Sequence, residues 1–253
     1  MYNKSGLLLY ICKPDDGGAG VETENGMKEE KKKKIRIGEE KQNKKTETES
    51  GYEEIESALH DPEFVKGQEE AIDFVKKQIN EINEKLSETV GRDLIDIVTY
   101  RKKTAESVRK KLIRKEHEVN WENARTKLND LTGIRISCSF QDDVYRLAGK
   151  LQKNKKFTLI KTKDYIKKPK ASGYQSIHII VDVLVDQGKD PMRVEIQLRT
   201  MAMNYWAKLD HQLCYKKESR DADKIRKELK EYAEEIAKID EKMLKLRKKI
   251  EKI

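Results

Sequence analysis

The chain has 253 residues, 36% of them hydrophobic, which suffices for one modest core with flanking helices but not for two large domains. Its 55 Lys and Arg against 46 Asp and Glu leave a formal net charge of +9, which favours polyanionic partners such as nucleotides, nucleic acid or an anionic membrane surface. Three cysteines without CxxC spacing argue against a disulfide framework or a zinc site. Because the apolar runs are too short for a membrane span, the sequence predicts a soluble, cytoplasmic chain.

Residues 1–50 contain four consecutive lysines at 31–34 and then alternate glutamate, lysine and threonine, with hardly any large apolar residue. Such a segment cannot bury enough apolar surface to offset the entropy lost on ordering, so it is predicted to be a disordered appendage. We expect the main domain to span 51–217 and a C-terminal helix to span 218–253.

Helical periodicity begins near Asp61, after which apolar residues recur at spacings of three, four and seven over 65–86. Asp61 and Pro62 suit the cap and first turn of this helix. Two shorter helices are predicted over Thr104–Lys115, with the threonine as N-cap, and over Trp121–Leu131.

From Ile134 to Phe140 apolar and polar residues alternate, which indicates a half-buried strand. A mixture of helices and strands around one sheet predicts the class α/β or α+β. The remaining strands are expected at 157–163, 175–185 and 192–199, and the remaining helices at 142–151 and 201–216.

The same alternation sorts the polar residues onto one face of the sheet. Glu195, Gln197 and Arg199 lie opposite the apolar residues of the last strand, while His178 and Arg135 do so on their own strands. For any single strand, a water-facing surface is the simpler explanation. Three strands together favour a functional site.

A loop and a basic segment extend this predicted site. The loop 167–174 combines lysines that suit phosphates with Tyr174, which offers a stacking face; alternatively, Gly173 only makes a turn and the tyrosine packs on the sheet. Along 101–115, only Glu106 is an acidic partner at helical spacing, so the segment resembles a polyphosphate cradle more than a salt-bridged surface. Its shared face carries Lys103, Ser107, Lys111 and Arg114.

Six segments resemble motifs of the small synthetases of the RelA/SpoT family, in the family's order and over about residues 60–250. They begin at 101, 130, 164, 173, 195 and 202 and read RKKTAES, DLTGIRI, DYIK, GYQSIH, EIQLRT and AMNYWA. Tyr100, Lys102 and Leu131–Thr132 depart from the family's usual residues, and none of these changes removes a charged catalytic group.

The resemblance implies a nucleotidyltransferase-like synthetase domain, with a mixed sheet of about five strands flanked by helices and with N- and C-terminal helices. It also implies a GTP pyrophosphokinase that moves the β,γ-diphosphate of ATP to the 3′-hydroxyl of GDP or GTP, making the alarmone (p)ppGpp of the stringent response. This chemistry needs alignment, charge neutralisation and a base. Hydrolase activity is not expected, because too few residues precede the synthetase region.

Carried over position by position, the resemblance implies Asp130 as the main Mg²⁺ ligand and Glu195 as second ligand and base. It implies stacking of Arg101 and Arg135 on adenine and of Tyr174 on guanine. The residues expected to bind ATP are Arg101, Lys103, Ser107, Lys111, Arg114 and Arg135. Those expected to bind the guanine nucleotide are Lys170, Tyr174, His178, Gln197 and Asn204.

The C-terminal segment carries an apolar stripe that alternates spacings of four and three. The stripe predicts an oligomerisation helix, and small synthetases of the family are typically homotetramers. Packing of the helix on its own domain is the alternative. The stripe consists of Ile225, Leu229, Tyr232, Ile236, Ile239, Met243, Leu246, Ile250 and Ile253.

Two other functions stay open at this point. Toxin-like relatives of the same fold pyrophosphorylate the 3′ end of tRNA, and the +9 charge and the lysines at 31–34 suit RNA. The motif GYQS at 173–176 favours a free nucleotide instead. A non-catalytic RNA-binding regulator is the second alternative, and the presence of both Asp130 and Glu195 argues against it.

Overall fold

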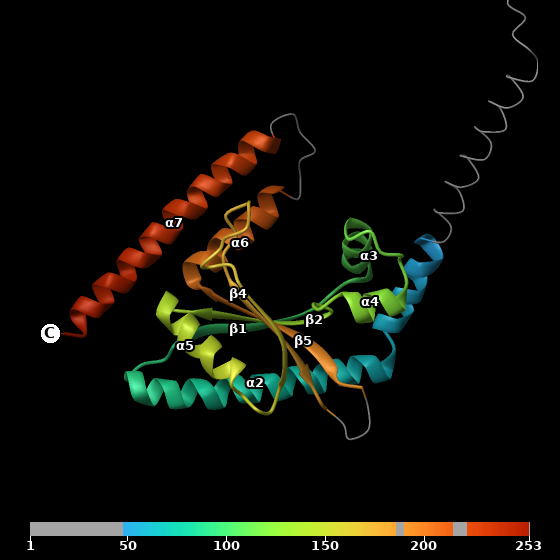
Figure 1. Cartoon of the computed structure of the whole chain (residues 1–253), viewed down its shortest axis with the longest axis horizontal. Helices are drawn as coiled ribbons and strands as arrows, with labels where there is room; N and C mark the ends of the chain where they lie inside the picture. The colour runs from blue at the N-terminus through green and yellow to red at the C-terminus, as the bar shows by residue number, and fades with distance from the viewer. Residues whose placement is uncertain (1–47, 186–189, 215–221, 253) are drawn as a thin grey trace, which may run out of the picture. The chain divides into compact units, whose positions relative to one another are not determined.

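The computed structural model describes residues 48–185, 190–214 and 222–252 (Figure 1). The predicted disordered appendage lies almost wholly outside the described residues, as do the last two residues of the helix predicted over 201–216 and Ile253 of the apolar stripe. Within the described ranges, no helix is long and apolar enough to cross a membrane.

A five-stranded mixed sheet forms the centre of the domain, with the order β1-β2-β5-β4-β3. Only the central pair β2–β5 is parallel, and its register places Gly133 opposite Glu195 and Arg135 opposite Gln197. The neighbouring pairs are antiparallel. This architecture confirms the predicted class. The strands are β1 (Ile95–Lys102), β2 (Thr132–Cys138), β3 (Thr158–Asp164), β4 (Ile177–Val183) and β5 (Met192–Thr200).

Helices α2 (Pro62–Val90) and α5 (Gln141–Gln152) cover one face of this sheet (Figure 1). Their apolar stripes and the inward side chains of the strands form the main core, in which Val75, Leu147 and Ile196 have no exposed surface. α2 begins where predicted, because the Asp61 carboxylate accepts hydrogen bonds from the amides of Glu63 and Phe64, both at 3.0 Å. The opposite face of the sheet therefore remains available for polar residues.

A second apolar cluster lies behind α3 (Ala105–Arg114) and α4 (Trp121–Lys127). A helix over residues 48–59 closes it, with Ile55 fully buried against Val108 and Leu112 of α3. Thr104 caps α3 as predicted, since its hydroxyl accepts from the amide of Ser107. This packing fixes the orientation of α3 and of the basic side chains on its other face.

Three elements differ from the sequence prediction. The helix over 48–59 was not predicted, and residues 48–50 at its start had been assigned to the disordered appendage. β1 was not predicted, because it is an edge strand whose alternation is blurred by exposed apolar residues: Ile97 is 47% and Tyr100 63% exposed. Arg101 therefore extends from a strand, not from a helix. α4 ends at Lys127 instead of Leu131, because Leu128 adopts extended backbone (φ −104°, ψ 138°) and buries its side chain.

Helices α6 (Met201–Cys214) and α7 (Ala222–Ile250) pack on each other. The indole of Trp206, 4% exposed, packs with Leu229 and Ala233 and donates a hydrogen bond of 2.9 Å to the carbonyl of Leu229. Toward the other end of α7, the guanidinium of Arg247 lies 2.6 Å from the carboxylate of Asp142 on α5. α7 is therefore anchored at two places along its length.

The predicted stripe of α7 divides between two faces. Leu229 is buried and Ile236 packs against the Trp206 cluster, so part of the stripe serves packing within the chain. The rest is about half exposed: Tyr232, Ile239, Met243, Leu246 and Ile250.

Cys138 occupies the end of β2 with no exposed surface. Burial raises the pKa of its thiol to about 12. The thiol is therefore uncharged at neutral pH, and it behaves as a small apolar core residue.

Candidate active site

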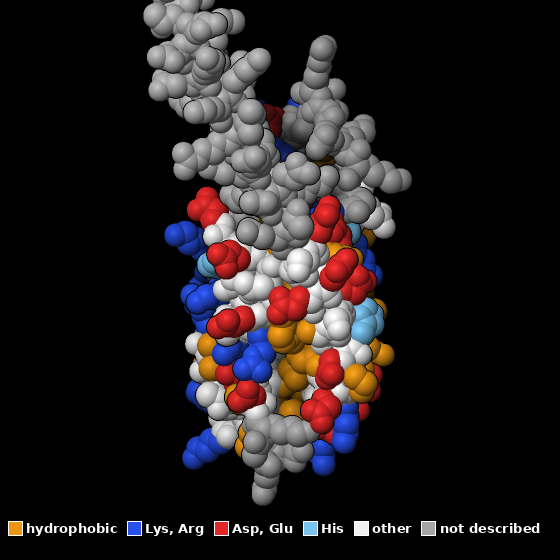
Figure 2. Space-filling model, turned by 90° about the vertical axis from the view of Figure 1, so that its right-hand side faces the viewer, with side chains coloured by type: hydrophobic (Ala, Val, Ile, Leu, Met, Phe, Trp, Pro, Cys, Tyr) orange, Lys and Arg blue, Asp and Glu red, His pale blue; other side chains and the backbone are white. Residues whose placement is uncertain are grey.

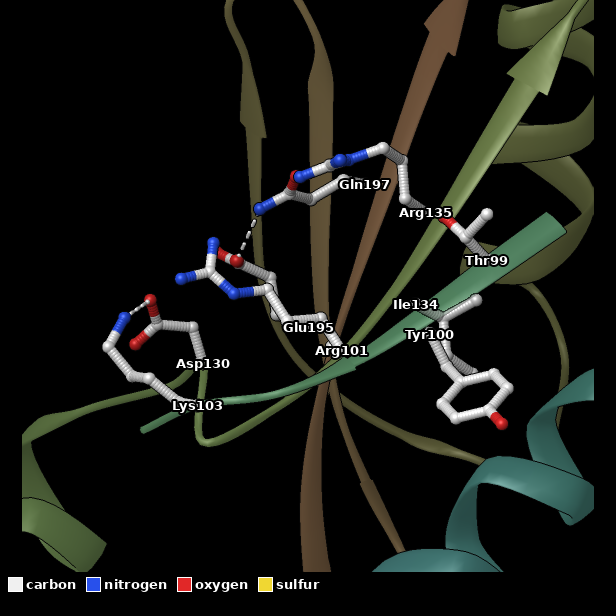
Figure 3. A pocket seen from close by; sticks show the side chains of 10 residues that line it. Thr99, Tyr100, Arg101, Lys103, Asp130, Ile134, Arg135, Glu195 and Gln197 are labelled. Carbon is white, nitrogen blue, oxygen red and sulfur yellow. Dashed lines mark hydrogen bonds and ion pairs between the residues drawn. The ribbon is translucent and has the colours of Figure 1, made fainter. Parts of the chain in front are cut away.

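The open face of the sheet carries a cleft with a volume of about 960 Å³, lined by side chains from β1–β5, α3 and α6. Ten Lys and Arg side chains line it, against three carboxylates, those of Asp130, Glu195 and Asp210. Such an excess of positive charge, concentrated in a concave site, attracts polyanions. A smaller pocket of about 280 Å³ overlaps it and is lined by residues of β1, β2 and β5 (Figure 3).

One end of the cleft is organised around Asp130. Its two carboxylate oxygens lie 2.6 Å from Lys103 Nζ and 2.7 Å from Lys111 Nζ. Burial opposes ionisation of this carboxyl, but the two ammonium groups outweigh burial and lower its pKa. The expectation of an unneutralised cationic face is thus wrong for these two lysines, whose counter-ion comes from a distant loop.

The local chain directions explain how these three side chains meet. The amide of Lys103, just after β1, donates to the carbonyl of Leu131, at 3.0 Å, so the end of β1 and the start of β2 lie together. From α2, the buried Gln68 donates to the hydroxyl of Thr132, at 2.9 Å. Because α4 stops at Lys127, the chain is free to turn and present Asp130 to α3.

The neighbouring part of the cleft is organised around Glu195 on β5, which is 8% exposed. One of its oxygens lies 2.9 Å from His178 Nδ1, and the other accepts from Gln197 Nε2 at 2.7 Å. Burial would raise the pKa of this carboxyl, but the interactions with His178 and the hydrogen bond from Gln197 together outweigh burial and lower it. Glu195 is therefore held ionised in a single orientation.

Tyr174 continues this hydrogen-bond network. Its hydroxyl lies 2.9 Å from His178 Nε2, accepts from Ser176 Oγ at 3.1 Å, and also contacts the guanidinium of Arg199. Lys170 Nζ lies 4.6 Å from the centre of its ring. The ring lines the cleft and also packs beside α6 and α7. Stacking of this ring on a base stays a prediction.

The cations of the cleft lie close enough to repel one another. Burial and the nearby Arg199 lower the pKa of Arg135. Burial also lowers the pKa of Lys170, and although Glu195 opposes this, Lys163 and Lys111 add to it. A bound polyphosphate would relieve this repulsion, so the site is electrostatically incomplete without an anion.

Comparisons with known proteins match this geometry. Residues 100–220 match the model of the region found in RelA/SpoT proteins. The chain is 34% identical to the GTP pyrophosphokinase YwaC of Bacillus subtilis, covering 72% of this chain and 87% of that protein. It is 35% identical to the GTP pyrophosphokinase YjbM of the same organism, covering 62% and 74%. The chain belongs to the RelA/SpoT family.

Solved structures of this family have the same fold. The crystal structure of small alarmone synthetase 2 from Bacillus subtilis aligns with a TM-score of 0.62 at 34% identity, covering 72% of this chain and 96% of that one. Small alarmone synthetase 1 from Bacillus subtilis, bound to its product pppGpp, aligns with a TM-score of 0.66 at 31% identity, covering 74% and 96%. The resemblance found in the sequence motifs is thereby confirmed.

Most of the site residues that the sequence analysis predicted line the cleft together. Ser107 and Asn204 do not: the first is tied to the cap, where it accepts from the hydroxyl of Thr104 at 2.9 Å, and the second lies on α6 outside the cleft lining. The predicted site residues that line it are Arg101, Lys103, Lys111, Arg114, Asp130, Arg135, Lys170, Tyr174, His178, Glu195 and Gln197.

Three further residues of the cleft were not assigned to either nucleotide in the sequence prediction. Arg199, 4% exposed, bonds to Tyr174 and donates to Gln197 Oε1 at 3.1 Å. Lys163 and Tyr165 line the cleft from β3 and the turn that follows it. The alternation along β5 already placed Arg199 on the polar face of the sheet, so its position in the cleft could be predicted from the sequence. The position of Lys163 in the cleft depends on the β3–β4 register, in which it pairs with His178, and the sequence does not reveal this register.

Asp130 and Glu195 are also the residues that could hold a metal. They lie in one pocket (Figure 3), close enough for the charge of Asp130 to oppose ionisation of Glu195. Among the described residues no group of three or more His, Cys, Asp or Glu side chains gathers at one point. In kinase-type sites, Mg²⁺ is typically bound by one or two carboxylates, and phosphates and water complete its coordination sphere. Asp130 and Glu195 therefore fit that ion.

Proposed function

We infer that the protein is a GTP pyrophosphokinase that uses ATP to convert GDP or GTP into the alarmone (p)ppGpp. The observation that carries this inference is the cleft, in which a carboxylate between two lysines faces a second carboxylate held by a histidine. The names of the relatives support the same activity, as does the alignment with a synthetase bound to pppGpp.

In the reaction, the 3′-hydroxyl of the guanine nucleotide attacks the β-phosphorus of ATP. The new O–P bond forms as the bond from that phosphorus to the oxygen bridging to the α-phosphate breaks, and AMP leaves. Glu195, ionised and fixed by His178 and Gln197, takes the hydroxyl proton. Lys103, Lys111 and the other cations of the cleft bind and align the phosphates, which supplies most of the catalysis in such transfers.

We propose that Mg²⁺ binds at Asp130 and Glu195. When bound, the ion would neutralise charge on the transferred phosphates. Lys103 and Lys111 hold Asp130 in place beforehand, and they are within reach to transfer their hydrogen bonds to the phosphates of ATP. Arg101 and Arg135, which both line the small pocket, would stack on adenine (Figure 3).

The direct test incubates the purified protein with γ-labelled ATP and Mg²⁺, and separately with GDP, GTP or tRNA. Label on GDP or GTP, and not on tRNA, is expected. A Glu195→Gln preparation made in parallel controls for contaminating kinases. Label appearing only on tRNA would assign the protein to the tRNA-modifying relatives, and no label on any acceptor would reject the enzyme function.

We also propose that the protein is a cytoplasmic homotetramer and that the exposed face of α7 contributes to its interface. Half-exposed Ile239 and Leu246 lie on that face, and neither belongs to the buried Trp206 cluster. Replacing both with Asp should reduce the mass measured by light scattering while leaving the melting temperature of the subunit nearly unchanged. The single change Lys242→Asp, on the same helix, also makes the net charge more negative by two units and controls for charge. A wild-type protein that is already monomeric would contradict the proposal.

A further inference from the structure

A second cavity, of about 700 Å³, lies outside the nucleotide cleft. Its walls come from the helix over 48–59, the first turns of α2, α4, and the strand ends flanking the β4–β5 connection. It shares no lining residue with the cleft. Figure 2 looks onto one side of the molecule and shows apolar side chains in a hollow, with Asp and Glu side chains around them.

The floor of this groove is apolar and partly aromatic. Phe64 and Trp121 meet edge to face with their ring centres 4.9 Å apart, and both remain partly accessible. Gly67 keeps the floor open, because a Cβ at this position would lie 3.0 Å from Met192 Cε. An aromatic floor of this kind can take one bulky apolar side chain of a ligand.

The rim of the groove is acidic in a chain whose net charge is +9. Two of its carboxylates are paired on the rim itself: Glu70 lies 3.7 Å from Lys66, and Asp190 lies 3.0 Å from Arg125. The other three have no cationic partner among the residues that the structure describes. These are Glu63, Glu54, which accepts a hydrogen bond of 3.3 Å from the amide of Trp121, and Asp61, which caps α2.

We propose that this groove binds a basic segment of a partner protein, in which a bulky apolar residue stands between lysines or arginines. The apolar residue would occupy the floor beside Trp121, and the cations would pair with the three rim carboxylates that have no cationic partner among the described residues. A polyanion such as RNA is disfavoured by the same rim charge, and a purely apolar ligand would leave the acids unused. Aromatic anchors surrounded by charge of the opposite sign are a recurring mode of peptide recognition.

The groove is connected to the cleft through two short paths. Trp121 and Arg125 belong to α4, and the loop after α4 carries Asp130. Gln68, which follows Gly67 in the groove, donates to the hydroxyl of Thr132 at 2.9 Å. A ligand in the groove therefore touches the elements that set the position of the Asp130 loop.

The test uses the full chain without nucleotides and a fluorescein-labelled peptide KKLRLKK, followed by fluorescence anisotropy. Saturable binding is expected, with weaker affinity at higher salt. The double variant Glu54→Gln/Glu63→Gln should weaken binding by about 2- to 30-fold, the range for two exposed ion pairs. The matched variant Glu84→Gln/Glu88→Gln, with two exposed acids on the distant part of α2, should bind like the wild type.

A further variant, Gly67→Leu, fills the floor and should abolish binding while the protein still melts cooperatively. Equal loss of binding in the groove and control double variants would mean nonspecific attraction and would overturn the proposal. Absence of saturable binding would overturn it too. If the peptide does not bind and the groove variants instead have a smaller mass by light scattering, the groove holds a second copy of the chain and the proposal is wrong.

Discussion

Asp130 and Glu195, two carboxylates of the nucleotide cleft, are held in place by different means. Asp130 lies between the flexible ammonium groups of Lys103 and Lys111, which are point charges that can turn to a new anion. Glu195 is held instead by the side chains of His178 and Gln197, whose positions are set by rigid strands. The difference indicates that the surroundings of Asp130 can rearrange when an anion binds, whereas those of Glu195 are already organised.

The largest expected effect comes from Glu195→Gln, which keeps the shape of the side chain and removes the base. Turnover should fall by about 10²–10⁴, the usual contribution of a positioned base. Thermal unfolding should change little, because the strand's apolar face is untouched. Near-normal turnover in this variant would remove Glu195 from the chemistry.

Variants of Tyr174 test whether binding of the guanine nucleotide depends on the aromatic ring or on the hydroxyl of this residue. Tyr174→Ala should raise the KM for the guanine nucleotide by about 5- to 150-fold, since base stacking contributes about 1–3 kcal/mol, and leave the KM for ATP unchanged. Tyr174→Phe keeps the ring and should retain the KM, but it breaks the hydrogen bond to His178. An equal increase for both substrates in Tyr174→Ala would mean that the ring only supports the sheet.

Asp130→Asn tests whether Asp130 is a ligand of the proposed Mg²⁺ site. An amide cannot neutralise a divalent cation, so the Mg²⁺ concentration needed for half-maximal activity should increase by about 10- to 100-fold, as for other residues that support a metal site. Asp96→Asn, an exposed carboxylate on β1, serves as the control. An unchanged magnesium profile would show that Asp130 is not a ligand.

The smallest effect is a shift in pH dependence. The hydrogen bond from His178 helps to keep the pKa of Glu195 below its ordinary value, so the base stays ionised as the pH falls. In His178→Ala this bond is lost, the pKa of Glu195 rises, and the acidic limb of the kcat/KM profile should move to higher pH. A limb that stays in place while kcat/KM falls uniformly would assign His178 to substrate binding alone.

Much of this arrangement was predictable because it depends on local patterns. Alternation along β4 and β5 placed His178 and Glu195 on the polar face, and the cap residues Asp61 and Thr104 marked the starts of two helices. The edge strand β1 escaped because one of its sides is solvated, so apolar residues do not alternate cleanly along it.

Other features could not be predicted from local sequence, because they depend on residues far apart in the chain. The pairing of Asp130 with Lys103 joins residues 27 positions apart. Asn204 matches a motif but lies outside the cleft lining, since motif identity does not specify which face of α6 meets the sheet. The apolar stripe of α7 was visible in the sequence, but its division between Leu229, buried, and Ile239, 53% exposed, depends on where α6 lies.

Because Cys138 is buried, the reactivity of its thiol can be used to measure how often the sheet opens. A thiol that is neutral and out of contact with solvent does not react with alkylating reagents, because the thiolate is the reactive species and it needs access. Cys138 sits on β2, between the strand that carries Glu195 and the edge strand β1. Its rate of alkylation, followed by mass spectrometry of the peptide that contains it, would therefore measure how often the centre of the sheet opens, with and without nucleotides bound.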